Sequence, residues 1–210
     1  LDFVMRPEQV EAVDKTIQYF NSFKKENKNK TPHFLWNAKM RFGKTFATYQ
    51  LAKKMGWTKI LVLTFKPAVQ SAWDEDLQTH IDFKGWQFIS RNGLNFKDVD
   101  KKKPFVCFGS FQDYLGKNEA GGIKARNEWV HATNWDCVVF DEYHYGAWRE
   151  NAKDLFEAEG KKELEFGEGE GMDYFDEGNM PITTNSYLYL SGTPFRAIAS
   201  GEFIEEQIYN

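Results

Sequence analysis

The chain has 210 residues and a formal net charge of −4. Hydrophobic residues make up 41% of it, and 19 Phe, 9 Tyr and 7 Trp supply large apolar side chains, which excludes disorder throughout. No apolar run approaches the roughly 18 residues of a membrane span, and no signal peptide is visible. We therefore expect a cytoplasmic protein without a membrane partner.

Charge is distributed unevenly along the sequence. Residues 1–149 hold 23 Lys and Arg against 17 Asp and Glu, a surplus of +6. Residues 150–210 hold 4 against 14, a deficit of −10. The front of the chain can therefore face a polyanion, whereas the back cannot do so directly.

Near the start of the chain, four apolar residues recur at helical spacing and predict a helix from about Pro7 to Phe23. These residues are Val10, Val13, Ile17 and Phe20. Pro7 suits the first turn of this helix. The stretch 24–31 is rich in lysine and asparagine, so we expect a surface loop there.

The middle of the chain alternates apolar runs with helical segments. A helix is expected from Lys44 to Met55, where Gly56 would end it, and another at 68–79. Strands are predicted at 34–36, 60–63, 86–90, 105–108, 137–140 and 187–190. Continuous apolar strands separated by helices imply an α/β fold, in which helices cover both faces of a parallel sheet. The crossovers should be right-handed.

Two cysteines, Cys107 and Cys137, lie inside these apolar runs. A metal site would need closer spacing and further His or Cys partners. We therefore expect buried, unpaired thiols.

One acidic segment interrupts the pattern. Residues from about 150 to 185 have no clear period and include Glu-Phe-Gly-Glu-Gly-Glu-Gly at 165–171. Glycine and mutually repelling carboxylates disfavour a helix there, which predicts an irregular insertion. Two interpretations remain open: a solvated excursion, or a surface that mimics nucleic acid or docks a partner domain.

Residues 38–45 read Ala-Lys-Met-Arg-Phe-Gly-Lys-Thr, between a predicted strand and a predicted helix. In a phosphate-binding loop, backbone N–H groups surround the phosphates at a helix N-terminus. Gly43 would allow close approach, Lys44 would reach the β- and γ-phosphates, and the Thr45 hydroxyl would ligate magnesium. The alternative is a chance Gly-Lys-Thr at a helix start. Arg41 departs from the pattern because glycine is common at its position.

An acidic pair, Asp141 and Glu142, follows the apolar run 137–140. Asp141 at the end of a buried strand can meet the magnesium, directly or through water. Glu142 is placed to orient or deprotonate the attacking water. The alternative is a solvated acidic turn. Together with the loop, the pair predicts a site that binds a nucleoside triphosphate and hydrolyses it.

These motifs carry a family resemblance. Asp-Glu-Tyr-His at 141–144 resembles motif II of the superfamily-two helicases and translocases, in the DExH form. Residues 38–45 resemble their motif I, most closely that of helicase-like (type III-like) restriction subunits. Residues 187–194, which end in Ser-Gly-Thr-Pro, resemble motif III. Arg-Pro-Glu-Gln at 6–9 resembles the Q-motif that reads adenine.

Two further segments resemble motifs that touch nucleic acid, Thr-Phe-Lys-Pro at 64–67 and Phe-Gly-Ser-Phe-Gln at 108–112. Ordinary loop capping explains their Ser and Thr residues equally well. Trp73 and Trp148 are candidates for stacking on bases, but tryptophans near strands and helices usually belong to the core.

The resemblance implies roles for individual residues. Catalysis would fall to Lys44, Asp141 and Glu142, and magnesium to Thr45 and Asp141, partly through water. The nucleotide would be held by Arg6, Gln9, Ala38, Met40, Arg41, Phe42, Gly43, Lys44, Thr45 and Phe46. The residues that would couple the nucleotide state to the nucleic-acid site are His144, Ser191 and Thr193. Nucleic-acid contacts would come from Lys66, Pro67, Ser110 and Gln112.

The resemblance also implies a RecA-like P-loop NTPase fold over residues 1–210, as the N-terminal ATP-binding domain of a longer motor. Relatives hydrolyse ATP between two such domains, and the second supplies arginine fingers. We therefore expect a second RecA-like domain in the same parent protein and slow turnover without it.

The implied function is that of a helicase or DNA translocase in a restriction-modification or mobile-element system. It would use ATP and Mg²⁺ and bind nucleic acid, DNA rather than RNA, with a methyltransferase or nuclease as partner. The alternative is a nucleotide-gated binding or regulatory module without translocation. A small-molecule kinase is disfavoured by the Ser-Gly-Thr-Pro motif.

Overall fold

A computed structural model describes residues 1–64, 70–115, 127–143, 182–193, 198–199, 201 and 203–210. The predictions for Lys66, Pro67, His144 and Trp148 lie outside these residues, as does the acidic insertion up to residue 181. In the described part of the chain, every helix is too short or too polar to span a lipid bilayer.

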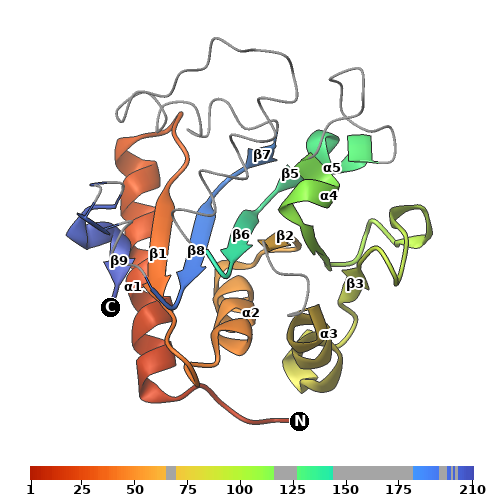
Figure 1. The fold of residues 1–210 in the computed structure, drawn as a ribbon, viewed down its shortest axis with the longest axis horizontal. Helices are drawn as coiled ribbons and strands as arrows, with labels where there is room; N and C mark the ends of the chain where they lie inside the picture. The colour runs from red at the N-terminus through yellow and green to blue at the C-terminus, as the bar shows by residue number, and fades with distance from the viewer. Residues whose placement is uncertain (65–69, 116–126, 144–181, 194–197, 200, 202) are drawn as a thin grey trace.

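The main sheet has seven strands in the order β3-β4-β2-β6-β8-β1-β9, and all of its strand pairs are parallel. The strands are β1 (His33–Asn37), β2 (Lys59–Thr64), β3 (Gln87–Ile89), β4 (Phe105–Ser110), β6 (Cys137–Asp141), β8 (Tyr187–Ser191) and β9 (Ile208–Tyr209). A separate parallel pair is formed by β5 (Asn134–Trp135) and β7 (Thr183–Thr184). Every strand that the sequence predicts is present. Figure 1 shows β1, β8 and β6 side by side in the sheet.

The described helices are α1 (Pro7–Glu26), α2 (Lys44–Met55), α3 (Gln70–Thr79), α4 (Phe111–Leu115) and α5 (Glu128–Ala132), with short 3₁₀ turns at Ile81–Phe83, Phe96–Asp98 and Glu205–Gln207. Three of them, α1 to α3, match the sequence in position and partly in length, whereas α4 and α5 were not predicted. The helix α2 has the predicted bounds, with Gly56 as its C-cap. The helix α1 continues beyond Phe23 to Glu26, because Lys24 and Lys25 are favourable in a last turn.

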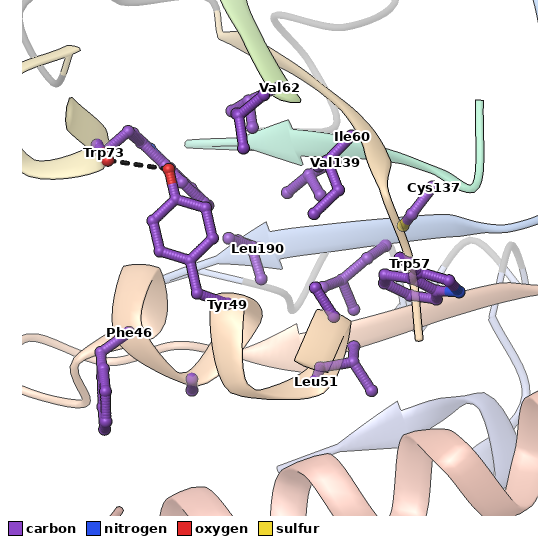
Figure 2. Close-up of a cluster of buried hydrophobic side chains, with 14 of the residues drawn as sticks. Phe46, Tyr49, Leu51, Trp57, Ile60, Val62, Trp73, Cys137, Val139 and Leu190 are labelled. Carbon is purple, nitrogen blue, oxygen red and sulfur yellow. Dashed lines mark hydrogen bonds between the residues drawn. The ribbon is translucent and has the colours of Figure 1, made fainter. Parts of the chain in front are cut away.

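One face of the sheet is covered by α1, α2 and α3. Alternate strand residues such as Ile60, Val62 and Val139 point to this face and pack against Phe46, Leu51 and other helix residues. Figure 2 shows part of this cluster, with Tyr49 of α2 and Trp73 of α3 next to each other.

The opposite face packs against the short helices α4 and α5. Leu61, Leu63 and Phe140 point to it and share a core with Tyr114 and Val130. The two faces alternate along each strand because successive side chains point to opposite sides. Helices therefore lie on both faces, as predicted.

Cys107 and Cys137 are free and buried, which confirms the prediction of unpaired thiols. Burial raises the pKa of each thiol to about 12. Neither is a reactive nucleophile, because the thiolate is absent at neutral pH.

The carboxyl ends of the central strands lie level with one another. Thr64 is in register with both Ser110 and Asp141, and Asn37 is in register with Ser191. In open parallel sheets, ligands bind at this edge. The polar residues named from the sequence are therefore brought to one edge.

The packing of α4 on β4 gives a first prediction. A Cβ added to Gly109 would overlap the Tyr114 ring. This ring is buried, so it cannot relieve the overlap by rotating into solvent. Gly109→Ala should lower the free energy of unfolding by about 1–3 kcal/mol, measured by denaturant titration. In a Tyr114→Leu background the same change should cost much less. An equal cost in both backgrounds would show that the ring is not the reason.

Candidate nucleotide-binding site

The turn between β1 and α2 reverses the chain through two left-handed residues. Arg41 has φ 71° and Gly43 has φ 75°. A Cβ at position 43 would also lie 2.5 Å from the Gln9 amide nitrogen, so this position requires glycine. The left-handed backbone explains why glycine is common at position 41. Here Arg41 is exposed to solvent, so its side chain does not fill the turn.

The first turn of α2 is open to an anion. Its N-cap is Gly43, and neither a capping side chain nor an acidic residue lies at this end. The N–H groups of the first turn therefore carry the partial positive charge of the helix without a side-chain acceptor. This is the arrangement that binds phosphate at helix N-termini.

The side chains in and beside this turn point in different directions. Phe42 and Phe46 are buried in the core, whereas Met40 is 91% exposed. Ala38 is buried at the end of β1. Of the residues assigned to the nucleotide, Phe42 and Phe46 can therefore contribute only through their backbone.

Arg6 and Gln9 hold the turn from the start of α1. The Arg6 guanidinium donates to the carbonyls of Arg41 and Phe42 at 2.5 and 2.6 Å. The Gln9 amide nitrogen donates to the carbonyls of Phe42 and Gly43 at 2.9 and 3.1 Å, while its oxygen accepts from the Arg6 N–H at 2.8 Å. Gln9 was predicted to read adenine, but the nitrogen and the oxygen of its side-chain amide both bond to backbone groups of the protein. Gln9 therefore helps to set the shape of the phosphate loop.

Gln9→Glu tests this contact because it replaces the donor by an oxygen of similar size. Two carbonyls would then face a carboxylate, so nucleotide affinity should fall by on the order of 10-fold, the equivalent of about 1–2 kcal/mol. Binding of a fluorescent ATP analogue measures this change. Glu11→Gln on the same helix is the control and should bind normally. Unchanged affinity of Gln9→Glu would contradict a role for the contact.

Lys44 brings the loop and the acidic pair together. Its ammonium lies 2.6 Å from Asp141 Oδ1 and 2.5 Å from Glu142 Oε1. Burial acts to lower the pKa of Lys44, but the attraction of its ammonium to Asp141 and Glu142 and the hydrogen bonds that it donates to them outweigh burial and raise this pKa. Lys44 is therefore charged at neutral pH and compensates the two carboxylates.

The strand β6 fixes the position of Asp141. Cys137 and Val139 point to the face covered by α2, so the alternation along the strand turns Asp141 to the same face. The Asp141 side chain is completely buried, and its two oxygens accept hydrogen bonds from the Glu142 N–H at 2.9 Å and the Trp73 indole at 2.8 Å. Glu142 follows with φ 53°, a sharp turn that directs its carboxylate back to Lys44.

The end of β8 contacts both motifs. The Ala38 N–H donates to the Ser191 carbonyl, and the Tyr143 N–H donates to the Leu190 carbonyl, each at 2.8 Å. The Ser191 hydroxyl accepts from the Thr193 N–H at 3.2 Å. Adjacent residues of one strand therefore contact the phosphate loop and Tyr143, the residue that follows the acidic pair.

The donors at this site suit magnesium. Thr45 is buried in the first turn of α2, beside the Lys44–Asp141 contact. Hydroxyl and carboxylate oxygens are hard donors, and Mg²⁺ commonly uses one or two protein ligands together with substrate phosphates. Among the described residues there is no group of three or more His, Cys, Asp or Glu that could hold a metal ion.

Of the residues assigned to nucleic acid, Ser110 and Gln112 are described. The Ser110 hydroxyl accepts from the Asp113 N–H at 3.0 Å, which is the loop-capping role. Gln112 is exposed. Trp73 is completely buried, so it belongs to the core and does not present its ring to bases.

The contact between Trp73 and Asp141 is the part of the site that the motifs did not identify. A signal was present in the sequence, because a buried indole N–H needs an acceptor and α3 follows a strand that ends at the site. Which acceptor it finds depends on the packing of α3 and is not visible from spacing.

Comparison with known proteins identifies the family. The family model named ResIII, described as type III restriction enzyme, res subunit, matches residues 2–196. The chain belongs to the ResIII family.

A protein of Mycoplasma pneumoniae, named as the C-terminus of a type II restriction enzyme and methyltransferase, is 32% identical to this ResIII chain over 221 residues. The match covers 96% of the chain and 30% of that relative, so the chain spans about a third of the relative's length.

Solved structures agree on the fold of the ResIII chain. The SWI2/SNF2 ATPase core of Sulfolobus solfataricus in complex with double-stranded DNA is 17% identical, with a TM-score of 0.55 over 95% of this chain and 34% of that one. The UvsW helicase of bacteriophage T4 is 14% identical, with a TM-score of 0.53 over 99% of this chain and 60% of that one. These similarities confirm the predicted RecA-like α/β fold.

Proposed function

We propose that the chain is the ATP-binding domain of a nucleic-acid-dependent ATPase, a helicase or DNA translocase of a restriction-modification or mobile-element system. The observation that carries this proposal is the contact of Lys44 with both Asp141 and Glu142 at the carboxyl edge of the sheet. Membership of the ResIII family supports it.

In the proposed site, the backbone of residues 38–45 and the Lys44 ammonium hold the phosphates. Thr45 and Asp141 would hold Mg²⁺, which would neutralise charge on the phosphate oxygens. Glu142 orients the attacking water and accepts its proton. Lys44 is shared between carboxylates and phosphates, so its contact with Glu142 must loosen before Glu142 can act as a base.

Nucleic acid would be contacted by Lys66, Pro67, Ser110 and Gln112. The contacts would be to the backbone and therefore salt-sensitive and largely independent of sequence. We propose DNA rather than RNA as the partner, because one structural neighbour was solved with double-stranded DNA and the Mycoplasma relative is named as a restriction enzyme. Ser191 and Thr193, with His144, would couple the two sites.

The whole protein would contain a second RecA-like domain that completes the site with arginine fingers. A methyltransferase or nuclease would act with the motor, in line with the name of the Mycoplasma relative, and the assembly would be cytoplasmic.

Steady-state ATPase assays on the full-length protein test the proposal, with duplex DNA, single-stranded DNA and RNA as separate additions. DNA should stimulate hydrolysis severalfold, and RNA should not. Residues 1–210 alone should bind ATP and hydrolyse it very slowly. Brisk DNA-stimulated hydrolysis by these residues alone would contradict the need for a second domain. DNA binding that depends on ATP without any hydrolysis would favour a nucleotide-gated module instead.

A further inference from the structure

Asp141 is held by three partners, one of which comes from α3. Oδ1 faces the Lys44 ammonium at 2.6 Å and accepts the Glu142 N–H at 2.9 Å. Oδ2 accepts the indole N–H of Trp73 at 2.8 Å, in a buried contact across 68 residues of sequence. The carboxylate thus has one oxygen turned to Lys44 and the other fixed by a neutral donor.

Trp73 is itself fixed by α2. The Tyr49 hydroxyl donates to the Trp73 carbonyl at 2.7 Å, drawn as a dashed line in Figure 2. The two rings meet edge to face, with their centroids 5.5 Å apart. Because α2 also begins with Lys44, one helix sets both the lysine and the tryptophan that contact Asp141.

We propose that Trp73 is a positioning residue for the metal-binding carboxylate. A buried carboxylate is stable only if its oxygens are paired, and it can otherwise rotate about its Cβ–Cγ bond. The indole N–H holds Oδ2 and so keeps Oδ1 turned towards Lys44, where the proposed metal would bind. Such outer partners commonly change metal affinity by about 10–100-fold. This inference rests on the proposed function, because it assumes that Asp141 serves a metal.

Trp73→Phe tests it, since phenylalanine keeps a six-membered aromatic ring in the core but lacks the pyrrole part of the indole and its N–H. The affinity of the full-length protein for a non-hydrolysable ATP analogue is measured in excess Mg²⁺ and in a chelator. The gain in affinity due to Mg²⁺ should fall by about 10-fold in the variant, while affinity in the chelator stays as in the wild type.

Trp135→Phe is the matched control. Trp135 is also completely buried, and its indole donates to the Val130 carbonyl at 2.9 Å on the opposite face of the sheet. The control loses the same kind of hydrogen bond, so its Mg²⁺ effect should remain that of the wild type. An equal Mg²⁺ effect in Trp73→Phe and the wild type would overturn the inference. Failure of the wild type to bind the analogue at all would instead overturn the proposed function.

A measurement on the wild type covers the case in which Trp73→Phe does not fold. The indole N–H signal of Trp73, assigned by NMR through its contact with Tyr49, should shift when Mg²⁺ is added to the analogue-bound protein. The Trp135 signal should stay in place. A stationary Trp73 signal with Mg²⁺ bound would overturn the inference.

Discussion

Lys44→Ala should lower the ATPase kcat/KM of the full-length protein by on the order of 10³-fold. Lys44 is the cation that compensates Asp141 and Glu142 and that would meet the phosphates. Without it, a phosphate chain would approach two uncompensated carboxylates, one of them completely buried. Both nucleotide affinity and the chemical step should therefore suffer, and steady-state kinetics with a separate binding assay measures the two losses.

Lys54→Ala on the same helix is the matched control. Lys54 makes an exposed ion pair with Asp14 at 3.3 Å, far along α2 from the phosphate loop. An exposed pair contributes little, so this variant should hydrolyse ATP normally. Normal hydrolysis by Lys44→Ala would place the site elsewhere in the molecule.

Glu142→Gln should separate binding from chemistry. The amide is close in size to the carboxylate but cannot accept a proton, so kcat should fall by about 10²–10⁴-fold. ATP binding should persist, because a negative charge is removed from beside the phosphates. Pre-steady-state assays should show bound ATP without a burst of ADP.

Glu128→Gln, at the exposed start of α5, controls for the general effect of removing a carboxylate. It should leave kcat unchanged. If Glu142→Gln also kept the wild-type kcat, another group would be the base. If Glu142→Gln lost ATP binding, as Lys44→Ala is expected to do, the acidic pair would contribute to ATP affinity rather than to activation of the attacking water.

The sequence predicts those parts of the fold that have strong local signals. The strands are continuous apolar runs, and α2 has the predicted bounds because a Gly stands at each end. By contrast, β9 has only two residues, and α4 and α5 have five each, too few to show a period. These elements form because they pack against the hydrophobic core, and such tertiary contacts are not visible in the local sequence pattern.

The meeting of Lys44 with Asp141 and Glu142 is predictable for a topological reason. Both segments follow parallel strands, and the carboxyl ends of such strands share one edge. The contacts of Gln9 and Trp73 are not predictable in this way, because they depend on how α1 and α3 are rotated against the sheet. Motif membership alone also assigned Phe46 to the nucleotide, whereas its position on the inner face of α2 places it in the core.

The strand order has a consequence for the timing of folding. Both neighbours of β1, the strand that leads into the phosphate loop, are β8 and β9 at the far end of the chain. Tyr189 contacts His33 across 156 residues, an interval that a ribosome translates in roughly 8–30 s. The nascent chain therefore carries β1 without its two neighbouring strands until β8 and β9 have been synthesised. Chaperones and ribosome-proximal partners would meet an exposed apolar strand before any nucleotide can bind.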